Sequence, residues 1–148
     1  MTPLELTGSS LSLNDVFSVA REMQEVVLSS SAKEKILASR KWIEEAVKKN
    51  ESVYGVTTGF GAFQNIRLEQ HQVEKLQRNL VLSHCAGVGE PFPDEVVRAM
   101  MLLRANALAA GYSGVRVEVV EMLLAMLNKQ VHPVVPSKGS VGSSGDLA

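Results

Sequence analysis

The sequence predicts a mostly α-helical protein with short extended segments and glycine-rich loops. Apolar residues recur at helical spacing in five segments, whereas residues 52–61 and 139–145 are rich in glycine and have no helical period. Hydrophobic residues make up 45% of the 148 positions and charged residues 21%, as in ordinary globular proteins. A chain of this length holds one hydrophobic core and hardly two.

The N-terminal part of the chain predicts an extended lead-in and two helices. Residues 4–6 precede a Gly-Ser-Ser turn and indicate a short extended segment. Ser12 is placed to cap a helix whose apolar face runs through to Val27. A capping box at Ser31 opens a second helix that ends near residue 49. The short break between the two helices predicts a helical hairpin.

The middle of the chain predicts a loop and two further helices. In residues 52–61 β-branched residues alternate with glycines, which indicates an extended piece that enters a glycine-hinged loop. A helix follows over residues 69–85, and glycines end it. Pro93 begins the next helix, residues 93–110, which is apolar around most of its circumference. Such a helix is buried, so we expect the chain to be part of a larger protein.

The last part of the chain predicts one more helix and an extended approach to a Gly/Ser-rich segment. Ser113 is placed to cap a helix whose apolar stripe runs from Val115 to Leu127. Residues 131–136 are expected to be extended because prolines restrict the residues before them. They lead into residues 139–145, Gly-Ser-Val-Gly-Ser-Ser-Gly.

The composition argues against several classes of function. The 15 basic and 16 acidic residues give a net charge of -1, so no overall field favours nucleic acid or an anionic membrane. One Cys and three His are too few for a disulfide framework or a structural zinc site. No apolar run approaches the roughly 18 residues of a spanning helix. The N-terminus has no signal-peptide pattern, so we expect a cytoplasmic protein without a metal.

The Gly/Ser-rich segment has two opposing interpretations. Such a stretch is most often a flexible linker or an expression scar, and the Lys-Ser/Thr of a phosphate-binding loop is missing after it. The triad Ser143-Ser144-Gly145 permits different chemistry. If the backbone nitrogen of Gly145 attacks the carbonyl carbon of Ser143, a five-membered ring closes, and glycine hinders this attack least. Loss of water from the ring and from Ser144 then leaves an exocyclic methylene, which is a strong electrophile.

Four motifs stand in order along the chain: residues 53–61 (VYGVTTGFG), 76–84 (LQRNLVLSH), 111–114 (GYSG) and 138–148 (KGSVGSSGDLA). Together they resemble the N-terminal part of the aromatic amino acid ammonia-lyases and aminomutases, which carry a 4-methylideneimidazol-5-one (MIO) group. The resemblance implies that residues 1–148 are an N-terminal, MIO-bearing domain. It further implies that a long helical bundle lies beyond residue 148.

The resemblance implies catalytic roles for two of these motifs. Ser143, Ser144 and Gly145 would form the MIO autocatalytically, without any metal or nucleotide. The family most often has Ala where this chain has Ser143, but only the backbone carbonyl of that residue enters the ring. Tyr54 would be a catalytic base on a mobile loop, although an isolated Tyr-Gly pair is more often a half-buried structural tyrosine.

Ser83 and His84 resemble the pair found in family members that act on histidine. The resemblance therefore implies that this pair and Gly61 bind substrate, and that ammonia is eliminated from L-histidine to give trans-urocanate. An imidazole exchanges hydrogen bonds with a substrate imidazole that a phenyl ring cannot make. Phenylalanine or tyrosine as the substrate, and an aminomutase reaction, stay open. The family also implies a homotetramer whose active sites are shared between chains.

Residues outside these motifs are interpreted as structural. Arg104 and Asn106 lie on an apolar helix and need partners if they are buried. Cys85 is expected to be a packed thiol rather than a nucleophile, because no activating group is visible. His71 and His132 have no metal-ligand spacing and are expected to be structural or exposed. The non-enzymatic alternative is a helical assembly domain with a Ser/Gly-rich tail.

Overall fold

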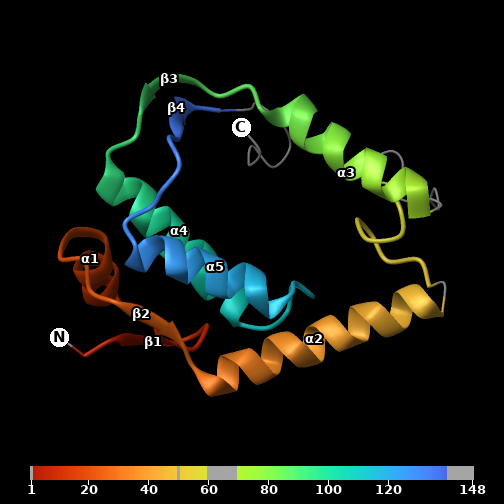
Figure 1. Ribbon diagram of the computed structural model, residues 1–148, viewed down its shortest axis with the longest axis horizontal. Coiled ribbons are helices and arrows are strands. Elements are labelled where there is room, and N and C mark those ends of the chain that lie inside the picture. Colours follow the sequence, from red (N-terminus) through yellow and green to blue (C-terminus); the bar gives the residue numbers. More distant parts are fainter. Residues whose placement is uncertain (1, 50, 60–69, 140–148) are drawn as a thin grey trace. The chain divides into compact units, whose positions relative to one another are not determined.

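The computed structural model describes residues 2–49, 51–59 and 70–139 (Figure 1). Helices dominate the described residues and the strands are short, which confirms the predicted fold class. In chain order the elements are β1 (Leu4–Leu6), α1 (Leu13–Arg21), β2 (Val26–Leu28), α2 (Ser30–Lys48), α3 (Gln70–His84), β3 (Val88–Pro91), α4 (Asp94–Ala109), α5 (Val117–Asn128) and β4 (Pro136–Lys138).

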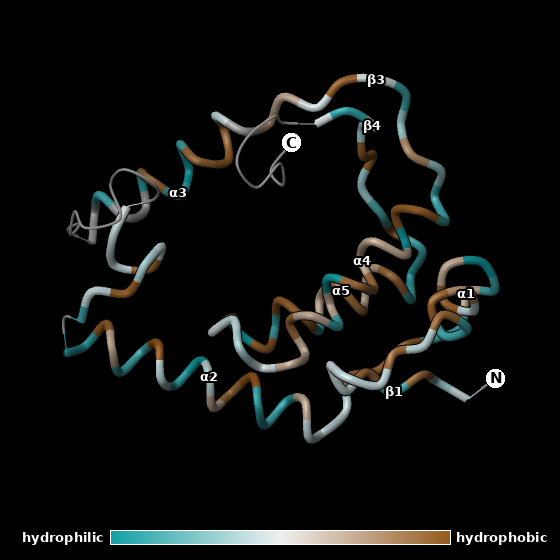
Figure 2. The backbone as a smooth tube through the Cα atoms, turned by 180° about the vertical axis from the view of Figure 1, so that it is seen from behind, coloured by the Kyte–Doolittle hydropathy of each residue, from teal (hydrophilic) through white to brown (hydrophobic). Residues whose placement is uncertain are grey.

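The described residues form two compact units. The first unit contains the chain up to Trp42 together with Phe92–Val135, and the second contains Ile43–Pro91 together with β4. The hydrophobic core lies in the first unit, where α1, α4 and α5 pack with the β1–β2 pair. Figure 2 shows apolar stretches along α4 and α5, the helices that contribute many side chains to this core. Its buried side chains are Leu6, Val19, Val26, Ala32, Ile36, Val97, Met101, Leu102, Ala105, Ala109, Val117, Val120, Leu124 and Leu127.

A parallel pair of strands replaces the predicted helical hairpin. Helix α1 ends at Arg21, and Val27 lies in β2, which pairs in parallel with β1. The side-chain amide of Asn128, at the end of α5, bonds both backbone groups of Val26 (Val26 N–H to Oδ1, 3.0 Å; Nδ2 to Val26 O, 2.9 Å). The predicted helix through Val27 is therefore wrong, because contacts distant in the sequence hold this segment extended.

The helix starts test the capping predictions. Ser12 caps α1 as predicted: its hydroxyl accepts the Asp15 N–H (3.2 Å), and the Asp15 carboxylate accepts the Ser12 N–H (2.8 Å). The Ser12 hydroxyl also donates to the Asp15 carboxylate (2.7 Å), and this hydrogen bond, together with that from the Ser12 N–H, lowers the pKa of Asp15. At α2 the prediction is wrong, because Ser29 rather than Ser31 accepts a helical N–H, that of Ala32 (3.1 Å).

The predicted helices 69–85 and 93–110 are confirmed to within one residue as α3 and α4, but α4 is not buried all round. Leu102 is fully buried, whereas Met100 and Leu103 are 44% and 51% exposed. Of the two polar residues expected to be structural, Arg104 is exposed. Asn106 Oδ1 is buried without a hydrogen-bond partner among the described residues.

The Gly-Tyr-Ser-Gly motif shapes the loop between α4 and α5. Gly111 has a φ of +82°, and a Cβ there would collide with Lys35 of α2. The Gly114 N–H donates to the Ser39 hydroxyl of the same helix (2.9 Å). Helix α5 begins only at Val117, so the predicted cap at Ser113 is wrong. The motif holds the loop on α2 instead of starting a helix.

A buried cation joins three helices of the first unit. Arg98 of α4 is 2% exposed. Its guanidinium donates to the carbonyls of Val19 (2.8 Å) and Ala20 (3.3 Å) near the end of α1, and of Leu127 (3.0 Å) near the end of α5. Carbonyls in the last turn of a helix lack intrahelical partners and favour a positive charge. Burial lowers the pKa of Arg98 from its usual value.

Loss of the Arg98 guanidinium is expected to destabilise the protein strongly. Arg98→Met keeps much of the apolar stem but leaves the Val19 and Ala20 carbonyls without this donor, while the Leu127 carbonyl keeps the Gln130 N–H (3.1 Å). The free energy of unfolding should therefore fall by about 3–5 kcal/mol. Arg104→Met, on the exposed face of the same helix, should change it by less than about 0.5 kcal/mol. Urea titration of the complete protein, followed by circular dichroism, compares the two. Equal destabilisation by both variants would contradict this role.

Candidate functional site

Tyr54 lies at the tip of a hydrogen-bonded turn in the second unit. The Val56 and Thr57 N–H groups both donate to the Val53 carbonyl (3.0 Å each), which closes a turn with Tyr54 in its second position. The Tyr54 side chain is 62% exposed. The expectation of an extended piece is therefore wrong at this point: the backbone reverses, and the phenol projects from the turn.

Gly55 makes this reversal possible. Its φ is +71°, a value that side-chain-bearing residues rarely adopt. A positive φ at the third position is what a type II turn needs, and glycine is the usual residue there. The glycine next to Tyr54 therefore fixes a tight turn rather than only loosening a loop.

Two consecutive threonine hydroxyls close the turn from its C-terminal side. Thr57 Oγ1 accepts the Val53 N–H (2.8 Å) and donates to the Glu51 carbonyl (2.8 Å). Thr58, which is buried, accepts the Gly55 N–H (3.3 Å) and donates to the Gly59 carbonyl (3.1 Å). The N–H groups on both sides of Tyr54 are thus held by side-chain oxygens.

The predicted substrate-binding pair lies at the C-terminal end of α3. His84 is the last residue of this helix, and its side chain lies outside the part that the structure describes. The hydroxyl of Ser83 donates to the Leu80 carbonyl (2.9 Å), and Ser83 is exposed. Cys85 follows as an exposed thiol, so the expectation of a packed cysteine is wrong.

A short antiparallel ladder connects the end of α3 with the approach to the triad. Strand β3 begins four residues after His84, and Val88 pairs with Lys138 of β4, which precedes Ser143 by five residues. Gly87 packs against the Pro136 ring, where a Cβ would sit 3.0 Å from Cγ. Two predicted site regions that are far apart in the sequence, the end of α3 and the triad, are thus each within a few residues of a strand of this ladder. The predicted site residues Gly61, Ser143, Ser144 and Gly145 lie outside the described residues.

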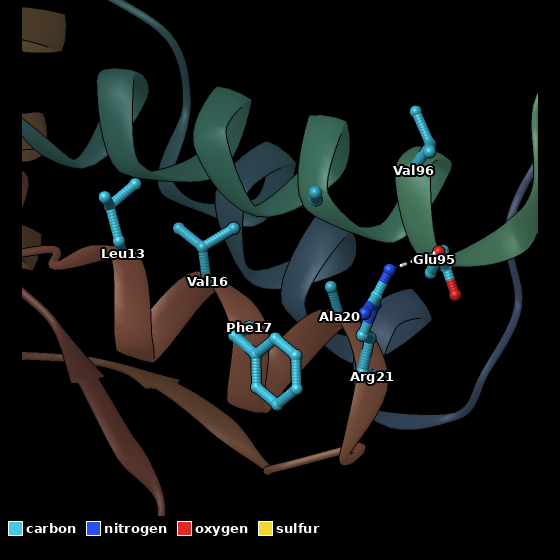
Figure 3. Close-up of a pocket in the computed structure, with 8 residues that line it drawn as sticks. Leu13, Val16, Phe17, Ala20, Arg21, Glu95 and Val96 are labelled. Carbon is cyan, nitrogen blue, oxygen red and sulfur yellow. Dashed lines mark hydrogen bonds and ion pairs between the residues drawn. The ribbon is translucent and has the colours of Figure 1, made fainter.

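An apolar groove in the first unit offers no chemistry of its own. Figure 3 shows Leu13 and Val16 of α1 directed toward α4, with Arg21 reaching Glu95. The Arg21–Glu95 ion pair (2.9 Å) is exposed to solvent, and Arg21 also stacks 5.4 Å from the centre of the Phe17 ring. The groove is lined by this pair and apolar side chains, with no nucleophile, so it is not the candidate site.

The described residues contain neither a cluster of metal-ligating side chains nor a helix that could span a membrane. Across residues 2–49, 51–59 and 70–139, no three His, Cys, Asp or Glu side chains gather as metal ligands. No helix in those same ranges has the length and apolar character needed to span a membrane. His132 Nε2 lies 3.7 Å from Asp94 Oδ2, which agrees with a structural role for that histidine.

The threonine hydroxyls were not identified as site residues from the sequence. A signal was present, because Thr hydroxyls often bond backbone groups a few residues away and Thr57-Thr58 follows a Tyr-Gly pair. β-branched residues also favour strands, and this second tendency led to the expectation of an extended piece.

Comparison with known proteins gives a consistent result along the chain. A sequence model described as "Aromatic amino acid lyase" matches residues 11–148. The histidine ammonia-lyase of Caldanaerobacter subterraneus subsp. tengcongensis is 54% identical over 148 residues, all of this chain and 29% of that protein. The chain thus spans less than a third of this curated relative.

Solved structures resemble this chain in the same way. The histidine ammonia-lyase of Trypanosoma cruzi matches with a TM-score of 0.85 and 37% identity, over 95% of this chain and 27% of that one. The ergothioneine-degrading ergothionase of Treponema denticola matches with a TM-score of 0.88 and 35% identity, over 95% of this chain and 28% of that one.

Proposed function

The chain belongs to the aromatic amino acid lyase family, and from this premise we propose that the complete protein eliminates ammonia from L-histidine to give trans-urocanate. The observation that carries the proposal is the 54% identity, over all 148 residues, to a protein named histidine ammonia-lyase. Ergothionase has a similar fold at only 35% identity, so the fold alone does not select the substrate. Sequence identity favours histidine.

The proposal assigns residues 1–148 to an N-terminal domain that makes its own electrophile. The chemistry of the triad fits an MIO group: Ser143 contributes a carbonyl, Ser144 a hydroxyl that leaves as water, and Gly145 an amide nitrogen without a hindering side chain. Once formed, this group would supply an electrophilic methylene to the substrate, through either the amino group or the aromatic ring of that substrate. Neither a metal nor a nucleotide enters the proposed chemistry.

Tyr54 is the proposed base that removes the β-proton of the substrate. A base must come within hydrogen-bond reach of the proton that it takes. Tyr54 is 62% exposed at the tip of its turn, and this exposure supports the assignment and argues against a merely structural, half-buried tyrosine.

Ser83, His84 and Gly61 are the proposed contacts to the substrate side chain. His84 is the last residue of α3, and Ser83 precedes it. The His84 imidazole can exchange a hydrogen bond with the imidazole of the substrate, which distinguishes histidine from phenylalanine. We further propose a cytoplasmic homotetramer whose active sites are shared between chains. Each site would then combine residues of one chain with residues of a neighbouring chain.

Formation of the MIO group is expected to depend on Ser144 and not on Ser143. Intact-mass spectrometry of the complete protein should show the loss of two water molecules. Ser143→Ala is the matched control and should retain this loss, because only the carbonyl of residue 143 enters the ring. Ser144→Ala should abolish it. The same mass deficit in Ser144→Ala, or an unshifted mass in active protein, would refute the triad assignment.

Tyr54→Phe should lower kcat about 10²–10⁴-fold, the range expected when a general base is removed. The mass deficit of the MIO should remain, because Tyr54 is not part of the triad. Tyr112→Phe is the control, since Tyr112 is 91% exposed in the first unit and should retain activity. Near-full activity in Tyr54→Phe would remove Tyr54 from the role of base.

Histidine should be preferred over phenylalanine and tyrosine by at least about a hundredfold in kcat/KM. His84→Leu should lower kcat/KM for histidine much more than for phenylalanine, because it removes the hydrogen-bonding partner of the substrate imidazole. Product chromatography separates elimination, which releases urocanate, from transfer of ammonia to the β-carbon. A wild-type preference for phenylalanine would contradict the proposed substrate.

A further inference from the structure

The backbone N–H group on each side of Tyr54 donates a hydrogen bond to a threonine hydroxyl, that of Val53 to Thr57 and that of Gly55 to Thr58. Val53 and Thr57 exchange two hydrogen bonds: the Thr57 N–H donates to the Val53 carbonyl (3.0 Å), and the Val53 N–H donates to Thr57 Oγ1 (2.8 Å). The same hydroxyl donates to the carbonyl of Glu51 (2.8 Å), which lies two residues before Val53. A single oxygen thus connects three points of the turn.

We propose that Thr57 is a positioning residue for Tyr54. The Thr57 hydroxyl holds the turn closed, and the closed turn fixes the direction in which the Tyr54 side chain leaves the backbone. This inference rests on the proposed function, in which Tyr54 removes the β-proton. Thr57 itself has no contact with substrate in this account. It acts through the backbone of Val53 and Glu51, to which its hydroxyl is bonded.

The two functions of a hydroxyl explain why a threonine suits this position. A hydroxyl donates one hydrogen bond and accepts others, and Thr57 uses both abilities at 2.8 Å. Valine has nearly the same shape but neither donates nor accepts. Serine keeps the oxygen and loses one methyl group. The proposal therefore predicts that the oxygen, rather than the shape of the side chain, is required.

Thr57 is a better position than Thr58 or Gly55 for a substitution that tests the role of the turn. Thr58 is 3% exposed, so its replacement would also disturb packing. Gly55 has a φ of +71°, so any side chain there would strain the backbone whatever its effect on Tyr54. Thr57 is only partly buried, and a change from hydroxyl to methyl alters little beyond the two hydrogen bonds.

A loosened turn should affect the chemical step rather than substrate binding. Proton transfer requires the phenol oxygen within hydrogen-bond reach of the β-proton, and small misplacements of a catalytic group are costly. In the complete protein, Thr57→Val should lower kcat about tenfold to a hundredfold, with KM within about twofold and the MIO mass deficit intact. Thr57→Ser should restore most of the activity. Thr7→Val removes a hydroxyl bonded to Ser10 in the first unit and should leave kcat unchanged.

A double-mutant cycle distinguishes positioning from a general structural role. If Thr57 acts through the phenol, Thr57→Val should have no further effect on the residual kcat of Tyr54→Phe. A structural role would lower kcat by the same factor in both backgrounds. Equal effects in the two backgrounds, or failure of Thr57→Ser to restore activity, would overturn the proposal.

Hydrogen exchange gives a second readout that does not depend on turnover. The Val53 amide should be protected in the wild type and lose protection in Thr57→Val, while amides of α4 and α5 stay unchanged. Unchanged protection around residue 53 would also overturn the proposal, and so would loss of protection throughout the chain. If the wild type makes no urocanate, the proposed function fails, whereas wild-type activity with full kcat in Thr57→Val refutes only the positioning role.

Discussion

The positive charge of Arg98 is the constraint on which the core of the first unit depends. A buried guanidinium is unstable unless its donors are satisfied, and here backbone carbonyls near the ends of α1 and α5 satisfy them. Because these carbonyls need a donor and the charge needs acceptors, α4 can pack only where both requirements meet. Residues such as Leu102 and Val120 then fill the apolar space between the helices.

In the second unit, hydrogen bonds to the backbone hold a local turn and pair two distant strands. In the turn at residues 53–57 the threonine hydroxyls and Gly55 fix the backbone around Tyr54, and in the β3–β4 ladder two distant stretches are paired. The ladder starts just after α3 and just before the predicted triad. The proposed base and the proposed electrophile both need well-placed backbone. These hydrogen bonds hold the turn around Tyr54 and the chain as far as Lys138.

Local signals predicted the parts of the fold that depend on neighbouring residues. Ser12 and Asp15 form a capping box at the predicted N-cap, α3 ends close to its predicted glycine stop, and α4 begins next to Pro93. Long-range pairing overrides local pattern elsewhere. The Val26 segment is extended because β1 and Asn128 bond it, and neither partner can be inferred from its own sequence. Arg98 went unnoticed for the same reason: a lone arginine in an apolar helix does not reveal which carbonyls it will meet.

Only part of the candidate site could be predicted from the sequence. The motifs indicated Tyr54 and the Ser-Ser-Gly triad as candidate site residues. The contacts of the Thr57 and Thr58 hydroxyls could be recognised only in the folded structure, because each hydrogen bond depends on the turn that it helps to form. We propose that Tyr54 and the triad serve one kind of site, and a crystal structure of the complete protein with L-histidine bound is the sharpest test. We expect an imidazolone ring at residues 143–145. We also expect the phenol oxygen of a Tyr54, from the same or a neighbouring chain, in hydrogen-bond reach of the substrate β-carbon protons. An unmodified triad, or every Tyr54 directed away from the bound substrate, would contradict it.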